Sequence, residues 1–213
     1  MRFFPLGDSA LTIEFGNEIS LDLNAHSIAL ARKLLERPFA GMIEVVPAYA
    51  SVTAFFDPVA TNYSTVERSV WSAVEQIGSI ETGPTGSIEI AIHVTPEASP
   101  DLGRVAKFGD ISKEEVLDIF LTQTYRVYML GFLPGFAYMG EVDERIAAPR
   151  LETPRTKVAA GSIGIAGKQT GIYPLESPGG WNIIGRTDLK MFDPSADQPC
   201  LLKPGDEVRF VRC

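Results

Sequence analysis

The chain has 213 residues, of which 45% are hydrophobic and 22% charged, so it can build a globular core without disulfides or a structural metal. Its net charge of −8 and its lack of lysine or arginine runs argue against nucleic-acid binding, which needs a basic face. Two cysteines, Cys200 and Cys213, are too few for a disulfide framework and are expected to be reduced thiols. Because we find no signal-peptide core and no apolar run near the roughly 18 residues of a membrane helix, we expect a cytoplasmic protein.

The first part of the chain alternates strands and helices. Residues 10–15 alternate apolar and polar side chains, which predicts a half-buried strand. Apolar residues at helical spacing predict an amphipathic helix over residues 20–36. Two further strands are predicted at 42–46 and 51–56, separated by a turn that contains Pro47.

A second helix is predicted to begin near Ser64, because Ser64-Thr65-Val66-Glu67 fits a capping box. The order strand, helix, strand, strand, helix predicts a small α+β domain over residues 1–85. The turn-rich segment 81–86 is the predicted domain boundary.

Residues 86–213 are predicted to form a mostly β domain that begins with an alternating strand at 87–94. Two helices are expected next. Ser99 is the predicted N-cap of the first, with Pro100 at its first helical position, and Ser112 and Glu115 fit a capping box for the second.

From Tyr125 onward, glycine and proline recur every few residues between short β-type runs. Such a pattern predicts a closed or nearly closed barrel of short strands. The predicted strands lie at 126–129, 161–166, 181–185 and 208–211.

Several kinds of catalytic site are disfavoured. The chain has only two histidines, His26 and His93, and no cluster of metal ligands, so no metal site is predicted. The run 161–170 resembles a phosphate loop, but its spacing is one residue too long and Gln169 replaces the Mg²⁺-binding Ser or Thr. Ser177-Pro178-Gly179 lacks the preceding glycine of a nucleophile elbow, and no histidine follows it.

The region between Tyr125 and Arg186 instead favours a binding site. Its segment 131–138 places aromatic residues around a Pro-Gly turn, which suits an apolar pocket. Arg150 and Arg155 follow prolines and can present guanidinium forks to a carboxylate or phosphate. Segments 169–174 and 177–181 add an amide, hydroxyls and a tryptophan beside glycines that admit a ligand to the backbone, so we expect these groups to share one hollow.

The same region resembles the family of 5-oxoprolinase B subunits and KipI proteins, also known as allophanate hydrolase subunit 1. The resemblance rests on Tyr-Arg-Val-Tyr (125–128), Gly-Phe-x-Pro-Gly-Phe-x-Tyr (131–138), Pro-Arg-x-x-Thr-Pro-Arg (149–155), Gly-Ser-Ile-Gly-Ile-Ala-Gly-x-Gln-Thr-Gly-Ile-Tyr-Pro (161–174) and Ser-Pro-Gly-Gly-Trp (177–181). Weaker matches in the N-terminal part extend it over nearly the whole chain.

The resemblance implies an α+β N-terminal domain followed by a mostly-β cyclophilin-like barrel. It also implies one component of an ATP-dependent hydrolase complex, with Mg²⁺, that cleaves 5-oxoproline to glutamate together with a KipA/PxpC-like C subunit plus an A subunit. Two alternatives stay open: a KipI-like inhibitor of a sporulation-type histidine kinase, and a carboxyltransferase-like domain of urea metabolism. Family members usually carry a histidine where this chain has Phe120, so any chemistry that this histidine performs in them would be lost here, and the resemblance supports the fold more strongly than the activity.

On this interpretation, two sets of site residues are predicted. The catalytic group comprises Arg155, Gln169, Tyr173 and Ser177, which would offset anionic charge and orient the amide. The substrate-binding group comprises Phe132, Pro134, Gly135, Phe136, Tyr138, Arg150, Thr170, Gly171, Gly179 and Trp181.

Overall fold

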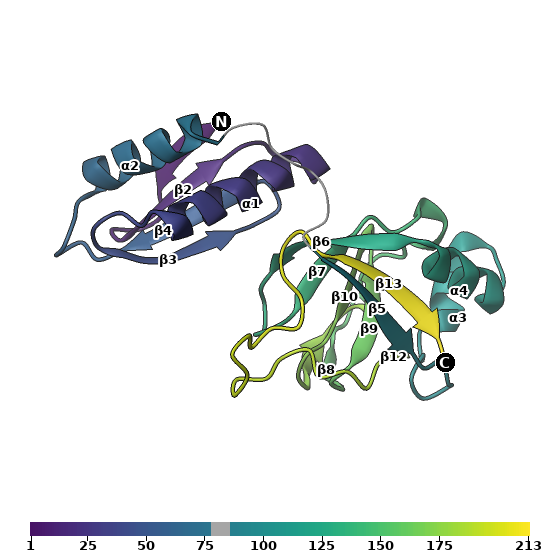
Figure 1. Ribbon diagram of the computed structural model, residues 1–213. Coiled ribbons are helices and arrows are strands. Elements are labelled where there is room, and N and C mark those ends of the chain that lie inside the picture. The colour runs from purple at the N-terminus through teal and green to yellow at the C-terminus, as the bar shows by residue number, and fades with distance from the viewer. Residues whose placement is uncertain (78–85) are drawn as a thin grey trace. The chain divides into compact units, whose positions relative to one another are not determined.

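The computed structural model of the chain describes residues 1–77 and 86–213. Its contacts divide the chain into two compact units, Met1–Gly83 and Pro84–Cys213 (Figure 1). Except for Gly86, the predicted boundary at 81–86 lies outside the described residues, and the division into domains 1–85 and 86–213 stays a prediction. Over the described ranges, no helix is long and apolar enough to cross a membrane.

The first unit is a four-stranded antiparallel sheet, in the order β1-β2-β4-β3, with two helices (Figure 1). Both helices cover the same face, because Leu30 of one and Val70 of the other share a buried cluster with the β2 residues Leu11 and Ile13. The elements are β1 (Arg2–Pro5), β2 (Ala10–Glu14), α1 (Leu21–Glu36), β3 (Met42–Pro47), β4 (Ser51–Phe56) and α2 (Tyr63–Glu75).

The structure adds a strand to this unit and corrects a helix start. Strand β1 was not predicted, and it pairs with β2 at the edge of the sheet. The predicted capping box at Ser64 is wrong, because α2 begins at Tyr63 and its N-cap is Asn62. The Asn62 side chain accepts a hydrogen bond from the Thr65 amide at 3.1 Å, which satisfies a free donor of the first turn.

The second unit is mostly β and is built on a seven-stranded sheet in the order β12-β9-β10-β7-β6-β13-β5. Backbone hydrogen bonds of 2.7 and 3.0 Å join His93, just after β5, to Arg186 of β12, so the sheet forms a nearly closed barrel. A ribbon of β8 and β11 forms a separate two-stranded sheet. The elements are β5 (Ser87–Ile92), α3 (Leu102–Gly109), α4 (Lys113–Thr122), β6 (Thr124–Leu130), β7 (Ala137–Gly140), the 3₁₀ helix η1 (Glu144–Ile146), β8 (Arg155–Val158), β9 (Ser162–Ala166), β10 (Gln169–Ile172), β11 (Ser177–Gly179), β12 (Asn182–Arg186) and β13 (Glu207–Arg212).

The predicted elements of this unit are present, with one corrected helix start. The capping box of Ser112 and Glu115 at α4 is confirmed in both of its hydrogen bonds. The predicted N-cap at Ser99 is wrong, because α3 begins at Leu102 and Asp101 occupies its N-cap position. Four strands were not predicted separately: β7, β8, β10 and β11.

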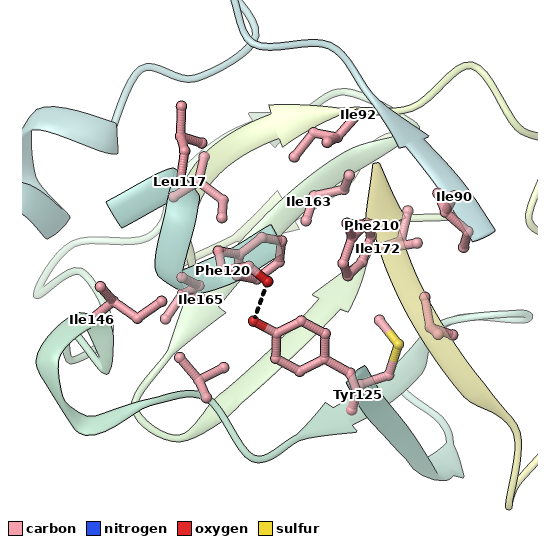
Figure 2. Packing of buried hydrophobic residues seen from close by; sticks show 14 of the residues in the cluster. Ile90, Ile92, Leu117, Phe120, Tyr125, Ile146, Ile163, Ile165, Ile172 and Phe210 are labelled. Carbon is pink, nitrogen blue, oxygen red and sulfur yellow. Dashed lines mark hydrogen bonds between the residues drawn. The ribbon is translucent and has the colours of Figure 1, made fainter. Parts of the chain in front are cut away.

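The barrel interior is filled by apolar side chains from the strands and from α4, among them Phe120 (Figure 2). The Phe120 ring is fully buried and lies 4.9 Å, centroid to centroid, from the rings of both Tyr125 and Phe210. The Tyr125 hydroxyl donates to the Phe120 carbonyl at 2.9 Å. Position 120 is therefore a core position in this chain.

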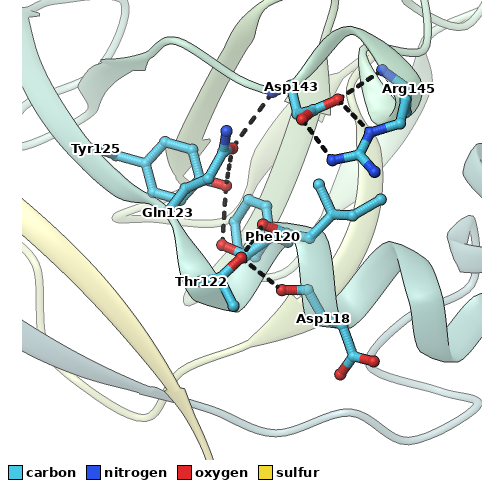
Figure 3. A network of polar contacts seen from close by, with 8 residues as sticks. Asp118, Phe120, Thr122, Gln123, Tyr125, Asp143 and Arg145 are labelled. Carbon is cyan, nitrogen blue, oxygen red and sulfur yellow. Dashed lines mark hydrogen bonds and ion pairs between the residues drawn. The ribbon is translucent and has the colours of Figure 1, made fainter.

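A polar network joins the end of α4 to the turn before η1 (Figure 3). The Gln123 Oε1 atom lies 3.1 Å from the Tyr125 hydroxyl and accepts from the Asp143 amide at 3.3 Å. Hydrogen bonds from the Arg145 guanidinium and backbone amide lower the pKa of the Asp143 carboxyl to about 2. These contacts fix the chain around Phe120 without a ligand.

We expect Phe120→Ala to lower the free energy of unfolding by about 3–5 kcal/mol, because it leaves a cavity in a close-packed core. The matched control is Phe108→Ala, since the Phe108 side chain on α3 is 49% exposed and should cost about 1 kcal/mol or less. Urea denaturation of the two variants measures the difference. Equal losses would contradict the assignment of Phe120 to the core.

Candidate functional site

A second, smaller apolar cluster lies on the other face of the barrel sheet from the main core. In β9, Ile163 and Ile165 belong to the main core, so Gly164 and Ala166 point to the opposite face. Ala166 packs there with residues from several segments, and this outer cluster comprises Phe136, Val158, Ala166, Tyr173, Trp181 and Ile183. The residues of this outer cluster thus come from the region between Tyr125 and Arg186, in which the binding site was predicted.

Two glycines make room for aromatic rings directly on the sheet. Gly164 and Gly171 are paired across β9 and β10. A Cβ atom at Gly171 would lie 3.0 Å from the Phe136 ring and 2.8 Å from the Ala137 carbonyl oxygen. A Cβ atom at Gly164 would lie 3.0 Å from the Trp181 Cβ atom, so side chains at either position would push the rings away.

Above this floor lies a cavity of about 320 Å³, here called the aromatic pocket. The buried Phe136 ring contacts three other aromatic rings of the lining, with centroid distances of 5.3 Å to Tyr173, 5.4 Å to Trp181 and 4.8 Å to Tyr138. The lining residues are Phe132, Phe136, Tyr138, Arg150, Leu151, Pro154, Tyr173, Pro178, Gly179, Gly180 and Trp181.

Among the residues that the structure describes, Arg150 is the only charged side chain that lines the aromatic pocket. Its guanidinium carbon lies 6.0 Å from the centre of the Trp181 ring, a cation–π arrangement. Burial raises the pKa values of Tyr138 and Tyr173, and the Arg150 charge opposes this rise only in part. Both phenols therefore keep their protons at neutral pH and can donate hydrogen bonds beside the cation.

The mouth of the pocket carries an unusual backbone conformation. Phe132 has φ of +66°, a left-handed conformation that is rare for a bulky side chain, and it is 61% exposed. Its ring still contacts Phe136 edge-on at 5.6 Å. Such backbone strain at a pocket is typical of ligand-binding loops.

A buried asparagine that sequence reasoning missed holds the Arg150 segment in place. The Asn182 amide nitrogen contacts the carbonyl oxygens of Pro149 and Ile165 at 3.0 Å each, and its Oδ1 atom accepts from Arg104 at 2.9 Å. The Leu151 amide donates to the Gly180 carbonyl at 2.8 Å. The residues on both sides of Arg150 are thus held, one by Asn182 of β12 and the other by Gly180 just before this strand.

Half of the predicted site residues line the aromatic pocket together. They are Phe132, Phe136, Tyr138, Arg150, Tyr173, Gly179 and Trp181. The other predicted residues, Pro134, Gly135, Arg155, Gln169, Thr170, Gly171 and Ser177, do not line it.

Hydrogen bonding and packing explain where several of these other residues lie. Thr170 is fully buried and donates to the Gly164 carbonyl at 3.0 Å, and Gly171 forms the floor under Phe136. Gln169 pairs with Gly140 and Ala166 in the sheet. These three residues are therefore paired within the sheet and do not line the pocket.

The remaining predicted residues lie in turns or in the ribbon. Ser177 is buried in β11, where its hydroxyl lies 3.2 Å from the Pro178 carbonyl oxygen. Pro134 is exposed in the turn after Phe132. Gly135 has φ of +80°, and a Cβ atom there would lie 2.8 Å from the Phe192 side chain, so this glycine permits a tight turn.

Arg155 forms an ion pair with Asp101, which sequence reasoning also missed. Its Nη2 atom donates to Asp101 Oδ1 at 2.6 Å, and Asp101 Oδ2 accepts from the Ile183 amide at 2.7 Å. The Asp101 side chain is only 8% exposed, so it needs both partners. Arg155 therefore lines a different cavity from Arg150.

Comparison with known proteins matches this chain to 5-oxoprolinase B subunits. A model of the family described as "Carboxyltransferase domain, subdomain C and D" matches residues 1–202. The B subunit of 5-oxoprolinase from Bacillus subtilis is 43% identical over 97% of this chain and 90% of its own length. This chain belongs to the family of 5-oxoprolinase B subunits. The resemblance inferred from the site motifs is thus confirmed.

Another 5-oxoprolinase B subunit from this family agrees, as does a solved structure. The protein of Escherichia coli O157:H7 is 36% identical over 99% of this chain and 95% of its own length. The crystal structure of TTHA0988 superposes with a TM-score of 0.85 at 35% identity and covers 96% of this chain. This chain spans only 40% of that longer chain.

No metal-ligand cluster accompanies the pocket of this member of the 5-oxoprolinase family. Across the ranges 1–77 and 86–213, no three His, Cys, Asp or Glu side chains gather in a way that could hold an ion. The described residues therefore offer no set of donors for a resident Mg²⁺ ion, which needs several oxygen ligands.

We expect Asp101→Ala to lower the free energy of unfolding by about 2–4 kcal/mol, because it leaves the Ile183 amide and the half-buried Arg155 guanidinium without their acceptor. Glu144→Ala is the control, since its ion pair with Lys168 is largely exposed and should contribute about 1 kcal/mol or less. Thermal unfolding compares the two. A small effect at Asp101 would mean that the pair does not fix Arg155.

Proposed function

We propose that this chain is the B subunit of an ATP-dependent 5-oxoprolinase complex, a hydrolase that cleaves 5-oxoproline to glutamate with the help of a KipA/PxpC-like C subunit plus an A subunit. We further propose that its barrel is cyclophilin-like, that residues 1–85 and 86–213 are separate domains, and that the aromatic pocket binds the lactam. The close relation to 5-oxoprolinase B subunits supports the assignment. The observation that carries the choice of site is the single cation, Arg150, on a wall of aromatic rings.

The chemistry of the pocket matches the two ends of 5-oxoproline. This compound is a flat five-membered lactam that carries one carboxylate. A guanidinium recognises a carboxylate with two parallel hydrogen bonds, and Arg150 supplies it. The rings of Phe136 and Trp181 suit the apolar face of the lactam, while the protonated phenols of Tyr138 and Tyr173 suit its carbonyl oxygen.

The proposed reaction needs ATP because a lactam is a poor electrophile. The amide oxygen attacks the terminal phosphorus of ATP and ADP leaves. Water then adds to the activated carbon, and the C–N bond breaks with protonation of the nitrogen, which gives an acyl phosphate. A second water releases glutamate and phosphate. In this scheme the aromatic pocket orients the lactam oxygen, and Tyr173 stays the proposed polar catalytic residue of this chain.

In the complex reconstituted from all three components, Arg150→Gln is expected to raise KM for 5-oxoproline about 10–100-fold, because one charge-assisted bidentate contact is lost. Turnover at saturating substrate should change far less. Arg209→Gln, an exposed arginine of β13 outside the pocket, is the matched control and should leave KM unchanged. An unaltered KM in Arg150→Gln, measured as 5-oxoproline-dependent ADP release, would refute the carboxylate contact.

Binding can also be read without turnover, because the chain has two tryptophans and only Trp181 lines the pocket. Trp71 is exposed in the first unit and packs on Phe3, so Trp71→Phe leaves a single reporter. Adding 5-oxoproline to this variant should change the Trp181 emission in a saturable way, and adding proline, which lacks the lactam carbonyl, should change it less.

Inhibition of a histidine kinase by the chain alone, with no such response, would favour the KipI-like alternative. Carboxyl transfer from biotin would favour the carboxyltransferase alternative.

A further inference from the structure

A second cavity of about 360 Å³ lies in the barrel unit and shares no lining residue with the aromatic pocket. We call it the basic cleft. The residues that matter here are Thr95, Glu97, Arg155, Lys157, Ser162 and Arg186, all of which line it. They come from the β8 strand, from β9, from β12 and from the segment after β5.

Three cations line the basic cleft against one carboxylate, that of Glu97, although the whole chain carries a net charge of −8. Two of the cations already have partners, since Arg155 pairs with Asp101 and Lys157 with Glu176 at 3.0 Å. Within the described parts of the chain, the Arg186 side chain makes neither an ion pair nor a hydrogen bond. Its charge is therefore available to a ligand.

A hydroxyl on the cleft wall points to the same conclusion. Ser162 is only 6% exposed, yet it lines the cleft. Among the residues that the structure describes, nothing accepts from or donates to its hydroxyl, whereas its backbone groups are bonded to Ala159 and Tyr173. Its hydroxyl is not among the buried side-chain atoms that lack a partner, so it is open to the cleft and can bond to a ligand there.

The cleft is also held rigidly. The Arg155 guanidinium is fixed by the buried Asp101 and keeps further N–H groups for other acceptors. The Arg186 backbone closes the barrel by its hydrogen bonds to His93. Gly161 precedes Ser162 with φ of +81°, and a Cβ atom there would lie 2.1 Å from the Thr187 carbonyl oxygen, so the backbone beside Arg186 has little freedom.

We propose that the basic cleft binds the phosphate groups of a phosphate ester or anhydride. A tetrahedral phosphate offers several charged oxygens in different directions, and so it can use two guanidinium groups, an ammonium and a hydroxyl at once. A lone carboxylate is planar and would be satisfied by one arginine. The phosphate class does not depend on the role of the aromatic pocket. That the phosphate belongs to the nucleotide of the 5-oxoprolinase reaction rests on the proposed function.

The test uses the full chain at low ionic strength, with binding measured by calorimetry for tripolyphosphate, inorganic phosphate, ATP and adenosine. The wild-type chain should bind tripolyphosphate and ATP. Arg186→Gln should weaken both about tenfold or more, because it removes the unpaired cation. Ser162→Ala should weaken them about threefold. Arg209→Gln, which removes the same charge from β13 outside the cleft, should stay within about twofold. Arg155 is not altered, because its loss would also strip the buried Asp101 of its partner.

The proposal would be overturned if the wild-type chain did not bind tripolyphosphate. It would also be overturned if Arg186→Gln and Arg209→Gln weakened binding equally, because binding would then depend on net charge alone. Adenosine binding as tight as ATP binding would also overturn it. Inorganic phosphate that binds as tightly as ATP would support the cleft and identify free phosphate as the source. The Trp181 response to 5-oxoproline should survive in Arg186→Gln, so failure of the cleft and failure of the lactam assignment give different results.

Discussion

The buried carboxylate of Asp101 is the constraint on which the site region depends. Removed from water, it is stable only because Arg155 and the Ile183 amide use both of its oxygens. These two bonds join the start of α3 to β8 and to β12, and hence join segments that are far apart in the sequence. Arg155 also reaches the Trp181 carbonyl at 3.5 Å. The Asp101–Arg155 ion pair therefore positions two groups at once. It orients Arg155 in the basic cleft, and through Arg155 it holds the backbone of Trp181, which lines the aromatic pocket.

The outer face of the barrel sheet makes two chemically different cavities possible. Where β9 and β10 carry glycines, aromatic side chains pack closely against the sheet and line an apolar hollow that also has one cation, Arg150, in its lining. Where β9 carries Ser162 and β12 carries Arg186, the neighbouring surface is polar and positive. In the reaction proposed above, the apolar wall would desolvate the lactam and the clustered cations would neutralise the phosphate donor.

Local signals in the sequence predicted local structure well. The alternation at 10–15 became β2, and the reciprocal bonds of Ser112 and Glu115 start α4 as expected, because both depend only on neighbours within a few residues. The start of α3 was missed since Asp101 is selected by partners 54 and 82 residues away, and no local pattern contains them. The strands β8 and β11 were missed for a similar reason. They pair with each other across a bulge, β11 consists of the turn formers Ser-Pro-Gly, and β8 has only four residues, too few for a clear alternating pattern.

The candidate site was predictable as a region but not as a geometry. Glycines, prolines and aromatics in 131–181 mark an unusual surface, yet the sequence alone cannot tell a wall residue from a floor residue. Gly171 and Gly179 look equivalent in the sequence, although the first lies under the Phe136 ring and the second at the pocket lining. Arg150 and Arg155 look like one clamp, but Asn182 holds the segment before the first and Asp101 holds the second. Since buried polar side chains decide which cavity each arginine lines, a motif that looks like one site in the sequence contributes to two cavities.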